Sequence, residues 1–124
     1  MIFQYTLEAV LTGYKTQTRR LIGKHDSALR DENGTITAIL VNGRAKWCVG
    51  KSYAVQARRT GQTVGRILLT GLREEVVKDI SAEDARAEGF PTRDIFLQHF
   101  RKINGVRSIE KRAWVLIFTL EKPD

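Results

Sequence analysis

Apolar residues follow two kinds of pattern along this chain, which together predict a mixture of strands and short helices. Runs rich in β-branched and aromatic residues predict strands at 35–41, 44–48, 52–56, 64–73 and 112–120, and a further strand is expected to end at Arg20. Asn42-Gly43 separates the first two runs and is typical of the type I′ turn of a tight β-hairpin. Residues 31–34, Asp-Glu-Asn-Gly, predict another turn.

Three segments have the spacing and end signals of short helices. Residues 6–12 are expected to form the first, with Thr6 able to cap it and Gly13 to end it. Ser81-x-x-Asp84 resembles a capping box that opens a second helix, and Gly89 closes it. A third is predicted over 92–104, where the apolar positions at helical spacing are Ile95, Phe96, Phe100 and Ile103.

These elements predict one α+β domain over residues 1–124. The chain has 124 residues, of which 42% are hydrophobic, and this suffices for a core without covalent staples. We expect a small mixed β-barrel with about three short helices outside the barrel or at one mouth. A barrel of this size has no room for a wide pore, so the site is expected in a cleft at the mouth. Residues 21–51 are the predicted mobile flap.

Cysteine and histidine usage argues against several classes of protein. Cys48 is the single cysteine and cannot form an internal disulfide, and His25 and His99 are far apart in sequence. We therefore expect no structural metal and no cofactor. No apolar run approaches the roughly 20 residues that span a bilayer, and the N-terminus lacks the pattern of a secretory signal. The chain is expected to be cytoplasmic and not bound to a membrane.

The charge points to polyanionic partners. Twenty-one Lys and Arg against fourteen Asp and Glu give a formal net charge of +7. RNA is the expected partner, and Lys15, Arg19, Arg20, Arg58 and Arg59 are predicted to share one basic surface. The alternative is a solvated basic surface without a dedicated partner.

The polar segment at 13–20 holds the richest chemistry. If it is extended, Lys15, Gln17 and Arg19 lie on one face, and Thr18 and Arg20 lie on the other with Thr16. A twist or bulge would then be needed to bring Lys15 and Thr18 together.

Gly13-x-Lys15-x-x-Thr18-x-Arg20 resembles the N-terminal signature of the ASCH domain, a small β-barrel related to the PUA RNA-binding fold. Further segments follow in the order expected for that family, at 49–56, 65–70, 79–90 and 113–118. The resemblance covers nearly the whole chain, and its strength is the order and spacing of the segments. It implies an RNA- or nucleoside-binding protein.

The resemblance also implies a catalytic set. In ASCH proteins that resemble N4-acetylcytidine amidohydrolases, a Lys and a Thr of this motif act with a Glu at a helix end, and Lys15, Thr18 and Glu88 match these positions. A neutral Lys15 could activate the Thr18 hydroxyl for attack on the acyl group. Alternatively, a charged Lys15 stabilises the oxyanion while Glu88 acts as the base. The residues leave both arrangements open. They also leave open a third interpretation, in which Glu88 is an ordinary surface acid.

A second group of residues is predicted to bind nucleic acid or substrate. Trp47 and Tyr53 could stack on a base, and Gln56 could read a base edge while Arg58 and Arg59 hold phosphate. Arg19 and Arg20, followed by the insert at 21–51, depart from the enzyme pattern, and they could cover the cleft or extend an RNA track. The alternation around Trp114 instead predicts a core residue.

Three function classes follow from these observations. The first is a non-catalytic RNA- or nucleotide-binding module, the second a hydrolase of N4-acylated cytidine nucleosides, and the third an ASCH-type ribonuclease. Histidines at unremarkable positions argue mildly against ribonuclease chemistry.

Overall fold

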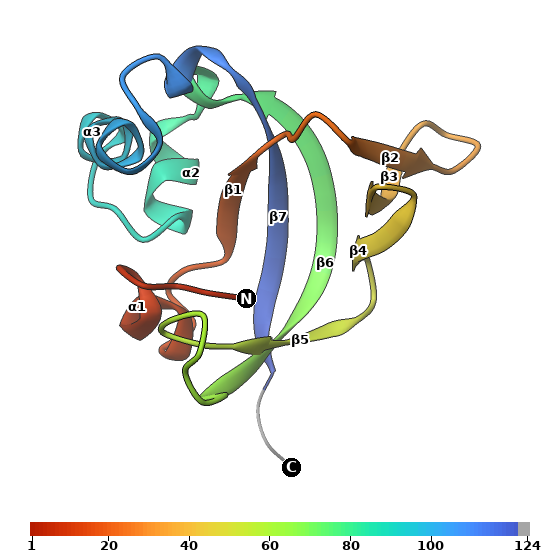
Figure 1. The fold of residues 1–124 in the computed structure, drawn as a ribbon. Coiled ribbons are helices and arrows are strands. Elements are labelled where there is room, and N and C mark those ends of the chain that lie inside the picture. Colours follow the sequence, from red (N-terminus) through yellow and green to blue (C-terminus); the bar gives the residue numbers. More distant parts are fainter. Residues whose placement is uncertain (122–124) are drawn as a thin grey trace.

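A computed structural model describes residues 1–121 and confirms the α+β class (Figure 1). Within these residues the strands form two antiparallel sheets. The four-stranded sheet has the order β1-β7-β6-β5, from β1 (Gln17–Leu21), β7 (Arg112–Glu121), β6 (Gly65–Val76) and β5 (Ser52–Val55). The three-stranded sheet has the order β2-β3-β4, from β2 (Asp26–Arg30), β3 (Ile36–Val41) and β4 (Arg44–Cys48).

The long pair β6 and β7 forms the centre of the fold. Four consecutive β7 residues, from Ala113 to Leu116, are buried, because both faces of this strand are covered. Ala113 packs with Phe96 and Phe100 on the helical side, and Trp114 packs with Ile36 and Ile39 on the side of the three-stranded sheet. Trp114 is therefore a core residue, as predicted.

Three α-helices cover one side of the main sheet (Figure 1): α1 (Leu7–Leu11), α2 (Ala82–Ala87) and α3 (Arg93–Asn104). Ser81 and Thr92 cap α2 and α3 by accepting hydrogen bonds from the backbone N–H groups of Asp84 and Ile95. The expected cap of α1 is wrong, since the Thr6 side chain forms no capping hydrogen bond.

The buried face of α3 also differs from the prediction. Phe96, Leu97 and Phe100 are buried, whereas Ile95 and Ile103 are 44% and 49% exposed. Phe96 and Phe100 meet the core together with Leu97, so the apolar stripe lies to one side of the predicted one.

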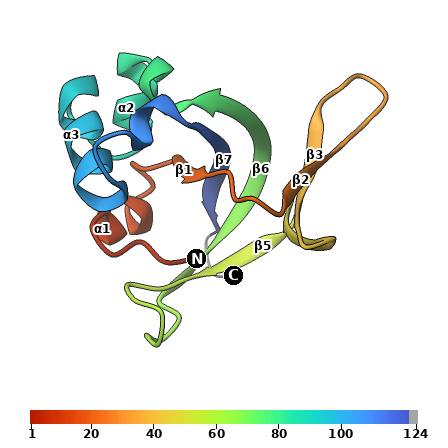
Figure 2. The ribbon, with the colours of Figure 1, turned by 45° about the horizontal axis from the view of Figure 1, so that its top comes forward.

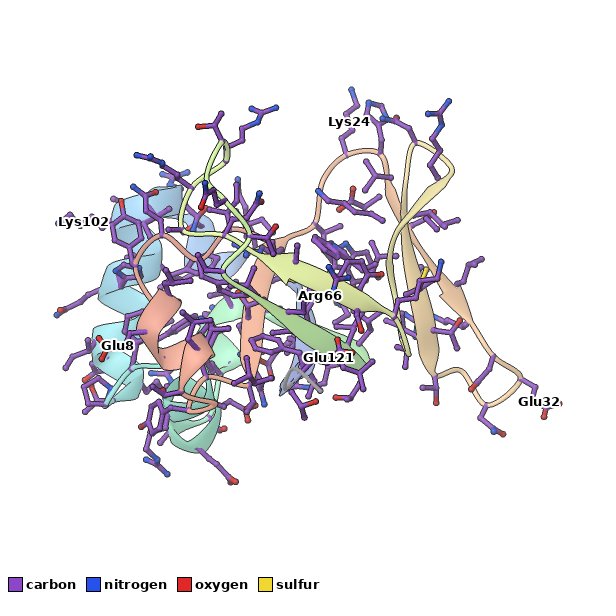
Figure 3. All side chains as sticks on the ribbon, turned by 90° about the horizontal axis from the view of Figure 1, so that it is seen from below. Glu8, Lys24, Glu32, Arg66, Lys102 and Glu121 are labelled. Atoms are coloured by element: carbon purple, nitrogen blue, oxygen red, sulfur yellow. The ribbon has the colours of Figure 1, made fainter. Side chains whose placement is uncertain are left out.

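The hairpin over β3 and β4 is confirmed, with positive φ at both Asn42 (53°) and Gly43 (78°), as a type I′ turn requires. Strand β2 was not predicted, and its turn to β3 is held by the Asp31 carboxylate, which accepts from the N–H groups of Asn33 and Thr35. Figure 2 shows the β2–β4 sheet standing away from the helices. Figure 3 places Glu32 at one end of this sheet and Lys24 at the other. The mobility of residues 21–51 stays a prediction.

The N-terminal segment runs between the helices and the three-stranded sheet (Figure 2). Ile2 forms a parallel bridge with Gln56, and the Phe3 N–H donates to the Gln56 carbonyl at 2.9 Å. The two sheets are joined where the Gly50 N–H donates to the Leu69 carbonyl at 2.8 Å. Closure of these strands into a barrel stays a prediction.

None of the helices within residues 1–121 combines the length and the apolar composition needed to cross a membrane.

Candidate functional site

An ion-pair network centred on Arg19 of β1 lies beneath the helices. The Arg19 side chain is 0% exposed, and Nε and Nη2 both donate to Oε1 of Glu75, at 3.1 and 2.8 Å. Nη1 donates to Glu88 Oε2 at 3.0 Å and to Gln17 Oε1 at 3.1 Å. Nη2 also donates to Asp84 Oδ2 at 3.4 Å. These contacts engage all five N–H donors of the guanidinium.

Lys15 binds Glu88 at the carboxylate oxygen that Arg19 does not contact. Its Nζ donates to the Glu88 carbonyl at 2.7 Å and to Glu88 Oε1 at 3.1 Å, and both side chains are 4% exposed. Lys15 precedes β1, and its own N–H donates to the Ala9 carbonyl at 2.9 Å. The pairing of β1 with β7 runs from Gln17 to Leu21 without a register shift, so β1 itself has no bulge. Glu88 is thus a buried acid held by two cations, and not a surface glutamate.

The end of α2 sets the position of Glu88. Glu88 is the C-terminal cap of α2, and Gly89 follows with a φ of 99°, a conformation that favours glycine. The Thr16 N–H donates to the Ala87 carbonyl at 2.8 Å, which ties the segment before β1 to the end of α2. The sequence signals that end α2 therefore also deliver the carboxylate to Lys15.

Burial lowers the pKa of Lys15 below the ordinary lysine value, because the ammonium is removed from water. The Glu88 carboxylate opposes this shift, whereas the positive charges of Arg20 and Arg19 add to it. Loss of the Lys15 proton is therefore easier than in water.

A cleft of about 330 Å³ opens beside this network, and the whole predicted catalytic set lines it. Lys15, Thr18 and Glu88 line it, as do Arg19 and Arg20. Its apolar wall includes Phe3, whose ring centroid lies 5.7 Å from both Lys15 Nζ and Arg20 Cζ. The volume is within the range of small-molecule sites.

His99 of α3 also lines this cleft, which its position in the sequence did not indicate. Its ring lies 4.8 Å from that of Phe90 and 5.1 Å from that of Tyr5. Burial lowers the His99 pKa, and the positive charge of Lys15 lowers it further. Both effects favour the uncharged imidazole.

The predicted shared basic surface is wrong in part, because Lys15 and Arg19 are each only 4% exposed. Arg20 is half-buried, and its Nη2 donates to the Ile2 carbonyl at 3.0 Å. Arg58 and Arg59 are exposed. The prediction assumed that these cations lie on the surface. Instead, Lys15 and Arg19 are buried, and Glu75, Asp84 and Glu88 neutralise them there.

Only part of the second predicted group, which was expected to bind nucleic acid or substrate, lines another cleft, of about 590 Å³. Trp47, Gln56 and Arg59 line this second cleft together with Arg20. Tyr53 and Arg58 are outside the residues that line either cleft. The Tyr53 hydroxyl accepts from the Cys48 N–H at 2.7 Å, and its ring packs edge-on against Trp47 at 5.2 Å. Gln56 Nε2 donates to the Gly61 carbonyl at 2.9 Å, so this amide braces the 57–61 turn.

Several functional neighbours were missed by reasoning from the sequence. Gln17, Glu75 and Asp84 hold Arg19, and Arg73 bridges the two acids by donating to Glu75 at 2.9 Å and to Asp84 at 2.7 Å. One signal was available, since alternation placed Gln17 on the face of Lys15 and Arg19. The pairing of β6 with β7 and the packing of α2, which deliver the acids, had no local signal.

No group of three or more His, Cys, Asp or Glu side chains within residues 1–121 is arranged to hold a metal ion. The predicted catalytic residues that line the first cleft supply an amine, a hydroxyl and a carboxylate.

Comparisons with known proteins identify the fold. No family model matches the chain, and no curated protein matches it. An ASCH domain from Lactobacillus crispatus is similar in structure, with a TM-score of 0.60 at 14% identity, over 97% of this chain and 75% of that one. A protein of Enterococcus faecalis assigned to the family DUF984 also has a TM-score of 0.60, at 17% identity over 93% of this chain. The present chain spans 66% of that protein's length. From the arrangement of its strands and helices, the chain has an ASCH-like fold.

Proposed function

We propose that the first cleft hydrolyses the amide of an N4-acylated cytosine, at the level of the nucleoside. One observation carries this proposal: Lys15 and Thr18 line a single cleft of about 330 Å³ with Glu88, which is 73 residues from Lys15 in sequence. An amine, a hydroxyl and a carboxylate are sufficient parts for acyl transfer. The resemblance of the Lys15 and Thr18 motif to the amidohydrolase-like ASCH proteins selects this substrate.

The contacts of Lys15 suit the role of a base. Its two hydrogen bonds to Glu88 need two N–H donors, which a neutral amine still has. The third position on Nζ is then a lone pair. Glu88 is the weaker candidate base, since its two carboxylate oxygens already accept from Lys15 and Arg19. Glu88 and Arg19 position Lys15.

The proposed reaction has two stages. The Thr18 hydroxyl oxygen bonds to the acyl carbon while its proton passes to the neutral Nζ of Lys15. The bond from the acyl carbon to N4 then breaks, and the departing nitrogen takes that proton, which frees cytidine. Water hydrolyses the acyl ester on Thr18 and releases the carboxylic acid.

Incubation with N4-acetylcytidine and with single-stranded RNA in parallel, followed by chromatography, tests this function. The wild-type protein should release cytidine and acetate, Thr18→Ala should release neither, and Thr18→Ser should retain activity because it keeps a hydroxyl. Thr16→Ala is the matched control in the same segment. A wild-type protein without turnover, or full activity in Thr18→Ala, contradicts the proposal.

The pH dependence of kcat/KM distinguishes the two possible bases. With Lys15 as the base, the rate should rise with pH through an apparent pKa below the ordinary lysine value of about 10.4. Glu88→Gln removes the negative charge that raises the Lys15 pKa, so the rising limb should move to lower pH. If Glu88 were the base, Glu88→Gln would abolish turnover at every pH. The initial rates of both proteins, measured across pH, are sufficient for this comparison.

A second candidate function is RNA binding without chemistry. It is favoured by the +7 charge and by the mutual engagement of Lys15 and Glu88, which is also a stable structural ion pair. Salt-dependent binding of RNA without release of acetate in the same assay would support it. Shortened RNA products would instead support the ribonuclease alternative.

A further inference from the structure

The second cleft is separated from the first by the N-terminal segment and by one arginine. It has a volume of about 590 Å³ and lies between that segment, the β3–β4 hairpin and the 57–61 turn. Ile2, Arg20 and Leu21 line both clefts. A ligand that fills the first cleft and passes Arg20 therefore enters the second.

Arg20 has a positive charge that the protein leaves largely uncompensated. Glu88, the acid whose charge acts on it, already binds Lys15 and Arg19, and Arg20 forms no ion pair within residues 1–121. Its one hydrogen bond, to the Ile2 carbonyl, leaves four of its five N–H donors for a ligand. Because a partly buried guanidinium without a counterion is costly, an anion between the clefts would be bound favourably.

The rest of the second cleft suits an aromatic anion. Trp47 provides ring surface, and Lys46 and Arg59 provide two exposed cations. The Lys46 Nζ lies 5.4 Å from the centroid of the Trp47 ring, so a phosphate attached to a stacked base would meet it. Asp26 is the acid among the lining residues, and its Oδ2 is occupied by the N–H groups of Gly23 and Trp114, at 2.7 and 3.0 Å.

We propose that the second cleft is a subsite for the nucleotide next to the acylated cytidine, with Arg20 gripping the phosphodiester that joins the two. This inference rests on the proposed function for its placement of the cytidine in the first cleft. The neighbouring base lies against Trp47, and Lys46 and Arg59 face its phosphates. A cytidine joined to a second nucleotide should then bind more tightly than the free nucleoside, which remains a substrate of the first cleft.

Tryptophan fluorescence reports directly on this subsite, because both tryptophans of the chain, Trp47 and Trp114, line it. The probes are cytidine, cytidine 5′-monophosphate and the dinucleotides CpU and UpC, which carry no acyl group and are not turned over. At least one dinucleotide should quench the fluorescence and bind at least about tenfold tighter than cytidine, from stacking and the phosphate contact. Equal affinity of both dinucleotides and the monophosphate would overturn the role of a second base.

Matched arginine variants separate the subsite from general electrostatic attraction. Arg59 lines the cleft and its neighbour Arg58 does not, and both are exposed in the same loop. Arg59→Ala should weaken binding of the trinucleotides CpUpU and UpUpC, which have a second phosphate for Arg59, about fivefold or more, whereas Arg58→Ala should not. Lys46→Ala and Arg44→Ala form a second such pair on β4, where Lys46 lines the cleft. Equal losses within each pair would overturn the proposal.

Failure of the subsite and failure of the proposed function give different results. Trinucleotide binding that depends on Arg59, in a protein that does not deacylate N4-acetylcytidine, contradicts the hydrolase and keeps the nucleotide site. Deacylation of the nucleoside by a protein whose fluorescence no dinucleotide changes contradicts the subsite alone.

Discussion

Replacing Lys15 with methionine is expected to lower the rate of N4-acetylcytidine deacylation by about a thousandfold, because the Thr18 hydroxyl loses its proton acceptor. The protein should stay folded but lose stability, because Lys15 is one partner of a buried ion pair. The methionine stem fills the apolar part of the site, and Glu88 keeps its contact with Arg19 at 3.0 Å. Initial rates of cytidine release, measured beside a thermal unfolding scan, provide both readouts.

Lys78→Met is the control for the loss of one positive charge, since Lys78 is exposed in the 3₁₀ turn over Val77–Asp79. It should deacylate at the wild-type rate. Lys15→Ala should regain part of its activity when a small primary amine is added, because the amine can replace the missing base. A folded Lys15→Met protein with the wild-type rate would exclude Lys15 from the chemistry.

Replacing Arg19 with methionine is expected to cost about 3–5 kcal/mol of the free energy of unfolding. The Arg19 side chain is 0% exposed and contacts three carboxylates. Its loss leaves the negative charges of Glu75, Asp84 and Glu88 with too few cations to neutralise them. For a chain of 124 residues, this corresponds to a fall in Tm of more than about 10 °C. Urea unfolding and thermal scans measure the two quantities.

Arg73→Met is the matched control, because Arg73 contacts the same Glu75 and Asp84 but its side chain is 38% exposed. Solvent screens that pair, so the expected loss is about 1 kcal/mol or less. Arg19→Lys should not restore stability, because a lysine has three donors where five are used. Similar losses in Arg19→Met and Arg73→Met would show that the network does not depend on its buried centre.

Local signals in the sequence were sufficient for most elements of the fold. The Asn42-Gly43 turn, the Ser81 cap and the helix end at Gly89 each depend on contacts within a few residues, and each is present. The signals that failed had competing tertiary partners. Thr6 does not cap α1, and the buried face of α3 is shifted because it packs against Val77, Ile80 and Ala113 from other elements.

In the candidate site too, local patterns could be identified from the sequence, whereas contacts between distant segments could not. The motif around Lys15 and Thr18 could be identified because its residues are neighbours in the chain, and Glu88 was added by the family resemblance. The burial of Arg19, the acids that neutralise it and the entry of His99 into the cleft depend on contacts more than 50 residues apart, such as Arg19 with Glu75 (56 residues) and Lys15 with Glu88 (73 residues).

The sequence by itself therefore determined which chemical groups this protein has, the ends of most helices and strands, and its excess of positive charge. Only the tertiary structure decided which of those charges are free, because the neutralisation of a cation depends on acids that folding brings to it. Lys15 and Arg19 are satisfied inside the protein, whereas Arg20, one residue further along the same strand, remains open to a ligand between the two clefts.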